Sequence, residues 1–124
     1  MLATNIVIAL FADELAVKHS LGEAHEVFIP SIAVGELCYG ARKSGRLKDN
    51  LERIDEFIAN ITVLGCDAET AKHYGEVKNK LRLKGRPLPE NDIWIAALTV
   101  QYNLTLVTRD AHFEEVENLR AVTW

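Results

Sequence analysis

The chain has 124 residues, the length of one domain with little room for two. Hydrophobic residues make up 48% of it and charged residues 26%, which is enough apolar material for one full core. The formal net charge of -4 excludes the overall basic character of a nucleic-acid coat protein, but not local basic patches. No apolar run could span a membrane and no signal peptide is evident, so we expect a cytoplasmic protein with reduced, partly buried thiols at Cys38 and Cys66.

Short β-rich runs alternate with helical patterns along the chain. Strands are expected at residues 1–2, 26–30, 61–65, 104–108 and 119–124. Helices are expected at residues 6–11, 13–21, 32–45, 46–60, 68–84 and 89–102, with a helical turn near 111–116. This alternation predicts an α/β fold, an α/β/α sandwich with a central parallel sheet, in a single domain over residues 1–124.

Polar residues mark the expected ends of several helices. Asn5, Ser31 and Asp67 each precede a helical pattern, where a side-chain oxygen can accept from the free backbone N–H groups. Gly85 and Pro87 follow the helix at residues 68–84, as is typical of a helix end. These boundaries leave only short loops between the elements.

In such a sheet ligands bind beyond the carboxyl ends of the strands, so the polar residues that follow each strand are the candidates. They are Thr4, Asn5, Glu36, Asn91, Asp92, Thr108 and Asp110. Glu36, Asp92 and Asp110 come from well-separated segments and together offer the oxygen ligands that Mg²⁺ or Mn²⁺ needs. Enzymes use such ions to cleave phosphodiester bonds. Ala3, at the end of the first strand, offers no ligand to a metal ion.

Each carboxylate also has a purely structural interpretation. Glu36 could face solvent, because an unpaired buried carboxylate is costly. Asp92 lies in a first helical turn, where the helix dipole favours any acid. Asp110 could cap the short helical turn that begins at Ala111. Only the three acids together favour a metal site.

Other polar and aromatic residues have two interpretations each. The cations of residues 78–86 and 42–48 are either solvated helix ends or phosphate contacts. His112 could approach the site through Asp110, although a surface histidine is the simpler interpretation. Trp94 and Trp124 are interpreted as core or interface aromatics.

Four stretches, in chain order, resemble the PIN-domain ribonucleases, and more narrowly the VapC-like toxins of bacterial toxin–antitoxin pairs. They are "ATNIVIALF", "IPSIAVGELCYGA", "LPENDIWIAAL" and "LVTRDAHFEEV". The resemblance covers essentially the whole chain. It implies an α/β/α sandwich, divalent-metal-dependent RNA cleavage, dimerisation, and inhibition by a small antitoxin that inserts a segment near an acidic pocket.

The resemblance also assigns two sets of residues to that pocket. Its acidic positions are matched by Glu36, Asp92 and Asp110. The polar positions that orient metal, water or the carboxylates are matched by Thr4, Asn5 and Thr108. Ala3 stands where the family has its first aspartate, and we interpret it as an engineered Asp→Ala substitution, with a naturally degenerate member as the alternative.

The sequence therefore predicts a metal-dependent endoribonuclease toxin that is disabled at Ala3. Its expected partners are RNA, a cognate antitoxin and a second copy of the chain, with helix residues from about 31 to 60 in a two-fold interface. The alternative, from a different functional class, is a non-catalytic PIN-like binding module that uses the same pocket to hold a protein or RNA.

Overall fold

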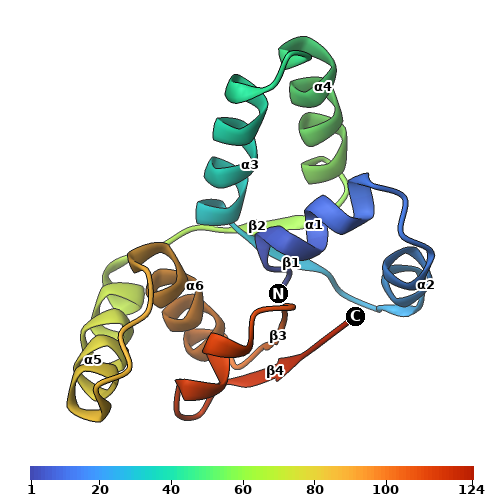
Figure 1. Cartoon of the computed structure of the whole chain (residues 1–124). Helices are drawn as coiled ribbons and strands as arrows, with labels where there is room; N and C mark the ends of the chain where they lie inside the picture. The colour runs from blue at the N-terminus through green and yellow to red at the C-terminus, as the bar shows by residue number, and fades with distance from the viewer.

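The computed structural model describes residues 1–124 and confirms the alternation of helices and strands (Figure 1). In chain order the elements are α1 (Thr4–Phe11), α2 (Leu15–Glu23), β1 (Phe28–Pro30), α3 (Ser31–Lys43), α4 (Leu47–Ile58), β2 (Thr62–Leu64), α5 (Ala68–Lys84), α6 (Glu90–Gln101), β3 (Thr105–Val107), the 3₁₀ turn η1 (Ala111–Glu115) and β4 (Arg120–Val122). Each strand has three residues, so the strands are shorter than the sequence predicts.

The strands form a parallel sheet that is joined in its middle by residues 1–3. β1 pairs with β2, and β3 pairs with β4, both in parallel. Between the two pairs, the Leu2 N–H donates to the Phe28 carbonyl (2.8 Å) and the Ala3 N–H donates to the Val107 carbonyl (3.0 Å). The order across the sheet is therefore β2, β1, residues 1–3, β3, β4, and the first strand expected from the sequence lies at its centre.

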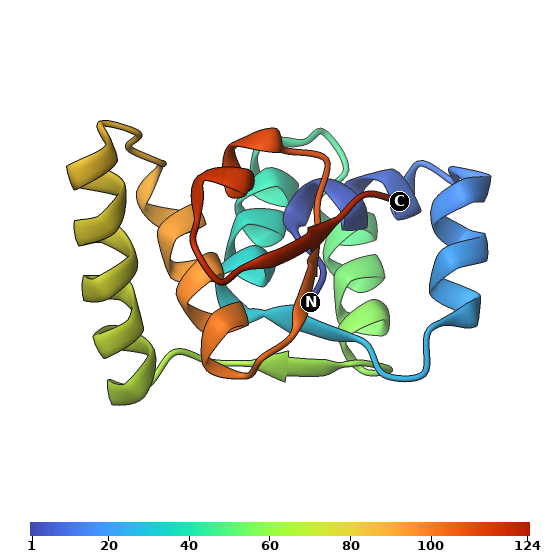
Figure 2. The same cartoon turned by 90° about the horizontal axis from the view of Figure 1, so that it is seen from below.

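Helices cover both faces of this sheet, as the two core clusters show. Met1 and Ala3 belong to a cluster of 12 buried residues that extends into α5 and α6. Leu2, which points to the opposite face, belongs to a cluster of 11 buried residues that extends into α1, α2, α3 and α4. α5 and α2 lie at opposite ends of the molecule (Figure 2). The α/β/α sandwich is confirmed.

Two of the expected helix caps are wrong. α1 begins at Thr4, so Asn5 lies inside the helix, and its N-cap residue Ala3 has no side chain that can cap. The N-cap of α3 is Pro30, and Ser31 is the first helical residue. In both places the chain enters the helix directly from an extended residue at a strand end, so the helix starts one residue or more before the expected position.

Other sequence expectations have mixed outcomes. Asp67 caps α5 by accepting from the Thr70 N–H (3.0 Å), and Gly85 ends this helix with a left-handed φ of 66°, as predicted. Cys38 is half-buried as expected, but Cys66 is exposed because it lies in the open turn before α5. None of the helices is both long and apolar enough to cross a membrane.

Candidate active site

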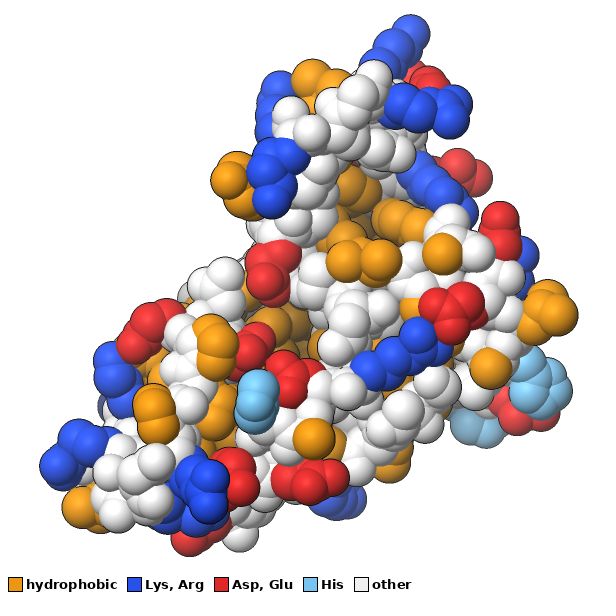
Figure 3. Space-filling model, in the orientation of Figure 1, with side chains coloured by type: hydrophobic (Ala, Val, Ile, Leu, Met, Phe, Trp, Pro, Cys, Tyr) orange, Lys and Arg blue, Asp and Glu red, His pale blue; other side chains and the backbone are white.

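The site is built where segments after the central strands meet the helices α3 and α6. Thr4 follows the strand segment 1–3 directly, and Thr108 follows β3. Glu36 comes from α3 and Asp92 from the first turn of α6. In the space-filling view, acidic side chains gather around a hollow between the α3 and α6 regions (Figure 3).

The surroundings of Asp92 disfavour its charged form. Burial raises the pKa of its carboxyl, and the nearby carboxylates of Asp110 and Glu36 raise this pKa further, whereas His112 lowers it. The helix dipole alone would act in the opposite direction. The three acids from distant segments therefore share one electrostatic environment in which negative charge is poorly compensated.

Glu36 is not the solvent-facing glutamate of the structural interpretation. Its side chain is half-buried, and its Oε1 accepts a hydrogen bond of 2.8 Å from Thr4 Oγ1. The contact ties the start of α1 to the second turn of α3. Thr4 therefore fixes one oxygen of this carboxylate.

Asn5 and Thr108 hold the segment that carries Asp110. Asn5 Nδ2 donates to Thr108 Oγ1 (3.5 Å), and the Arg109 N–H donates to Asn5 Oδ1 (3.3 Å). The Asp110 N–H in turn donates to Thr108 Oγ1 (3.1 Å). Thr108 itself is buried. The polar residues selected from the sequence thus lie where they can orient a carboxylate.

Asp110 also has the capping role that the structural interpretation assigns to it. Its Oδ1 accepts from the His112 N–H (2.9 Å) and lies 2.9 Å from His112 Nδ1. The His112 side chain is exposed, as expected for a surface histidine, yet it is close enough to lower the pKa of Asp92. A cap and a place in the acidic site are therefore compatible for Asp110.

The donor chemistry suits a hard divalent cation, but the ligand set is incomplete. Carboxylate oxygens are the preferred ligands of Mg²⁺ and Mn²⁺, and the raised pKa of Asp92 reflects charge that a cation would relieve. No three His, Cys, Asp or Glu side chains, however, are grouped as a metal site. Residue 3 contributes only a buried methyl group, in the same core cluster as Ile93 of α6.

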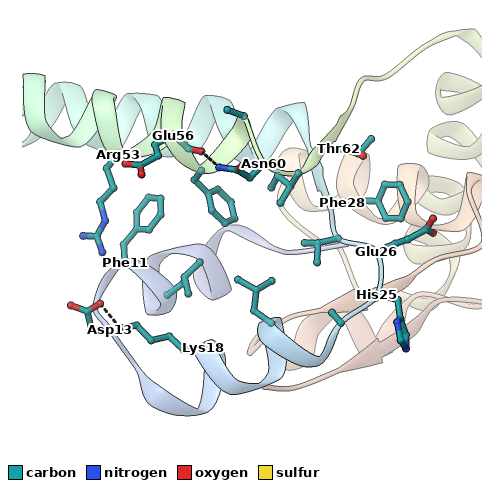
Figure 4. A pocket seen from close by; sticks show the side chains of 17 residues that line it. Phe11, Asp13, Lys18, His25, Glu26, Phe28, Arg53, Glu56, Asn60 and Thr62 are labelled. Carbon is teal, nitrogen blue, oxygen red and sulfur yellow. Dashed lines mark hydrogen bonds and ion pairs between the residues drawn. The ribbon is translucent and has the colours of Figure 1, made fainter.

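Two hollows lie against helices α1 and α4. The larger, about 1130 Å³, lies between α1, α2, α4 and the start of β1 and β2, and Phe11, Arg53 and Lys18 are among its lining residues (Figure 4). No predicted site residue lines it. A groove of about 210 Å³ between α1, α3 and α4 does reach Glu36, alongside Leu37 and others.

Most of the aromatic and basic residues that the sequence singled out contact other residues of the chain. Trp94 stacks on Tyr74 with ring centroids 4.1 Å apart, so it packs within the chain. Several of the basic residues are paired with acids: Lys78 with Glu90, Lys80 with Glu76 and Glu117, Lys84 with Glu115, Arg46 with Asp49, and Lys48 with Glu52. These pairs favour the interpretation of solvated helix ends.

Known proteins match this chain over its whole length. The PIN domain family model matches residues 1–119. The chain is 36% identical over 127 residues to ribonuclease VapC2 of Haemophilus influenzae and 35% identical over 128 residues to the tRNA(fMet)-specific endonuclease VapC of Shigella flexneri. Each alignment covers 100% of this chain and 96% of the relative.

Solved structures agree. The VapBC2 complex of Rickettsia felis bound to a DNA fragment from its promoter matches with a TM-score of 0.94 and 30% identity, over 100% of this chain and 97% of that chain. DNA-bound VapBC from Salmonella typhimurium also gives 0.94 and 30%, over 100% and 96%. Sequence, fold and the gathered acids lead to one conclusion: the chain belongs to the PIN-domain family and, within it, to the VapC ribonuclease toxins of toxin–antitoxin systems.

Proposed function

We propose that this chain is a divalent-metal-dependent endoribonuclease that alanine at position 3 disables. The observation that carries the proposal is the convergence of Glu36 on α3, Asp92 on α6 and Asp110 before η1, which lie close enough for the other two acids to raise the pKa of Asp92. Placing Asp110 and Glu36 near Asp92 disfavours the charged form of Asp92, and such perturbed acids are typical of functional sites. A bound cation would offset this destabilisation of the charged carboxylate.

Glu36, Asp92 and Asp110 would hold Mg²⁺ or Mn²⁺. Bound there, the ion supplies Lewis-acid stabilisation of the charge that develops on an RNA phosphate when water attacks in line. Thr4 fixes the orientation of the Glu36 carboxylate by donating to its Oε1. Thr108 and Asn5 position the segment that carries Asp110.

Position 3 would complete the ligand set. Its methyl group is buried at the end of the central strand segment, in the core cluster that reaches α6. Aspartate there would add one carboxylate beside the other three. We infer an engineered Asp→Ala substitution, and the coding DNA of the source decides between this and a naturally degenerate member.

The test is an RNA-cleavage assay of the chain and its A3D variant, with Mn²⁺ and with a chelator. We expect A3D to cleave about 100-fold faster or more, and only with metal, because loss of a ligand costs at least as much as loss of its supporting contacts. The matched control, A3D with Asp110→Asn, keeps a capping side chain and should lose the gain. Equal activity of both forms would show that position 3 is no ligand. No activity in either form would favour the binding module.

A small antitoxin is the proposed protein partner, since the similar solved structures are VapBC complexes. We propose that a segment of the antitoxin lies in the groove between α1, α3 and α4 and places a cation beside Glu36. Gly40 lines this groove, and a Cβ there meets nothing within 4 Å. Gly40→Leu should therefore weaken antitoxin binding without lowering the melting temperature, because leucine favours the helix more than glycine does. Gly22→Leu, at an equally open site outside the groove, is the control.

We also propose a two-fold homodimer through residues from about 31 to 60. Tyr39 on α3 is 64% exposed and does not line the groove, so it is available for such an interface. Trp94, the other aromatic residue considered for an interface, does not support the proposal, because it stacks on Tyr74 within the chain. Light scattering at micromolar concentration should give the mass of a dimer, and a monomer mass would contradict the proposal.

A further inference from the structure

We propose that the Arg109–Glu14 ion pair is a positioning device for the acidic site. Arg109 precedes Asp110 directly, and Glu14 lies between α1 and α2. The pair would hold the segment 108–110 in the geometry that the reaction requires, without contacting the substrate or the metal. This inference rests on the proposed function, in which Asp110 is a ligand.

The pair has the geometry of a clamp. Arg109 Nη1 donates to Glu14 Oε2 (3.1 Å) and Nη2 donates to Glu14 Oε1 (2.9 Å), so both carboxylate oxygens are engaged. Nε and Nη2 also donate to the Trp124 carbonyl, at 3.4 and 3.3 Å. The pairing lowers the pKa of Glu14 and raises that of Arg109. One side chain thus links the segment to two distant parts of the chain.

The anchor at Glu14 is itself fixed by backbone contacts. The Glu14 N–H donates to the Ala9 carbonyl (3.2 Å) and the Asp13 N–H donates to the Leu10 carbonyl (3.0 Å). With Asp13 in the left-handed region at φ 61°, these contacts form a Schellman motif at the end of α1. The Asp13 carboxylate also pairs with Lys18 at 2.8 Å. The backbone at Glu14 is therefore fixed by local contacts that do not involve Arg109.

The segment 108–110 is therefore held by residues at both ends of α1. At the start of α1, Asn5 accepts from the Arg109 N–H and donates to Thr108 Oγ1, at 3.3 and 3.5 Å. These distances lie at or beyond the upper end of the ordinary range, so the Asn5 contacts alone hold the segment weakly. At the end of α1, Glu14 holds the Arg109 side chain through two shorter contacts. The clamp supplies the restraint that Asn5 lacks.

A purely structural ion pair predicts a different result from a positioning pair. Both side chains are more than a third exposed, so breaking the pair should change global stability little. A catalytic carboxylate, by contrast, must be held to within about 0.5 Å of its productive place. Loss of positioning should therefore lower kcat while the melting temperature and KM stay close to those of the parent.

The experiment compares Arg109→Gln and Glu14→Gln with Lys72→Gln, which breaks the exposed Lys72–Glu69 pair (3.0 Å) on α5, outside the site and the proposed interface. In the chain as it stands, amide hydrogen exchange of Arg109 and Asp110 should become several-fold faster in the first two variants and stay unchanged in the third. In the A3D background, kcat should fall about tenfold, with Arg109→Lys intermediate because lysine lacks the two-pronged contact.

Unchanged exchange at Arg109 and Asp110 would overturn the inference, whatever the activity. Faster exchange with an undiminished kcat in an active A3D protein would also overturn it, because the segment would then move without consequence for the reaction. Faster exchange in a protein whose A3D form cleaves no RNA would support the clamp as the restraint on the segment and would contradict the proposed function instead.

Discussion

Glu90 and Asp92 lie two residues apart in the first turn of α6, and the pKa values of their carboxyl groups move in opposite directions. The Glu90 pKa is lowered by hydrogen bonds from Lys78 and Tyr74. The Asp92 pKa is raised by burial and by two neighbouring acids. The same helix dipole acts on both groups, so tertiary partners decide the difference. The contacts of Glu90 stabilise its charged form in the folded chain, whereas the surroundings of Asp92 destabilise its charged form.

Cleavage should show the largest contrast between the two acids. In the A3D background, Asp92→Asn should reduce metal-dependent RNA cleavage about 100-fold or more, because it removes a proposed ligand. Glu90→Gln should leave cleavage close to that of the parent, since Glu90 faces Lys78 on the surface. Initial rates with saturating Mn²⁺ measure both. Similar losses of cleavage in the two variants would contradict the expected difference between Asp92 and Glu90.

Metal-free stability should change in opposite directions. Asp92→Asn removes a poorly compensated charge, and because solvent screens a half-exposed carboxylate the gain should be of the order of 0.5 kcal/mol. Glu90→Gln should lower the melting temperature slightly through loss of the Lys78 contact (2.6 Å). Thermal unfolding in chelator gives both values, and a destabilised Asp92→Asn protein would contradict the expectation.

The effects of Asp92→Asn and Glu90→Gln on stability should also depend on pH. The folded-state pKa of Asp92 is raised, so the unfolded chain loses this proton first, near its ordinary value of about 3.9, and stability falls as the pH rises towards the folded-state pKa. The folded-state pKa of Glu90 is lowered, so its stabilisation is present above about 4.3 and disappears as the pH falls through the folded-state value. Melting curves across this range should show both mutational effects growing with pH, with opposite signs.

The smallest effect concerns Lys78. Its pKa is raised chiefly by the hydrogen bond to Glu90, yet both side chains are about half exposed. Lys78→Met should therefore lower the melting temperature only slightly, and salt should remove the difference because it screens exposed pairs. Unfolding at low and high salt checks this. A large, salt-independent loss would mean that the pair positions α6 itself.

Local patterns predicted most of the fold, while contacts between distant residues accounted for the errors. The apolar run of α6 and the cap at Asp67 depend on neighbouring residues, and both predictions are confirmed. Asn5 was wrongly assigned as a cap because its partners, Thr108 and Arg109, lie more than 100 positions away along the chain. A capping preference cannot reveal such competition.

The candidate site shows the same difference between what general patterns predict and what distant contacts decide. The rule that ligands gather beyond strand ends selected Glu36, Asp92 and Asp110 together with their polar neighbours, because it depends on topology and not on side-chain detail. It did not select Glu14, whose contact with Arg109 joins residues 95 positions apart. No local signal in the sequence marks that pair.

The central position of residues 1–3 has a consequence for synthesis of the protein. Residues 1–3 can join the sheet fully only after β3 has emerged, because the Met1 nitrogen donates to the Thr105 carbonyl and the Ala3 N–H donates to the Val107 carbonyl. Contacts of such long sequence separation form late in folding. Glu36 and Asp92 are therefore synthesised before the central strand segment can gain its neighbour β3, and the acidic pocket can assemble only after β3 has emerged.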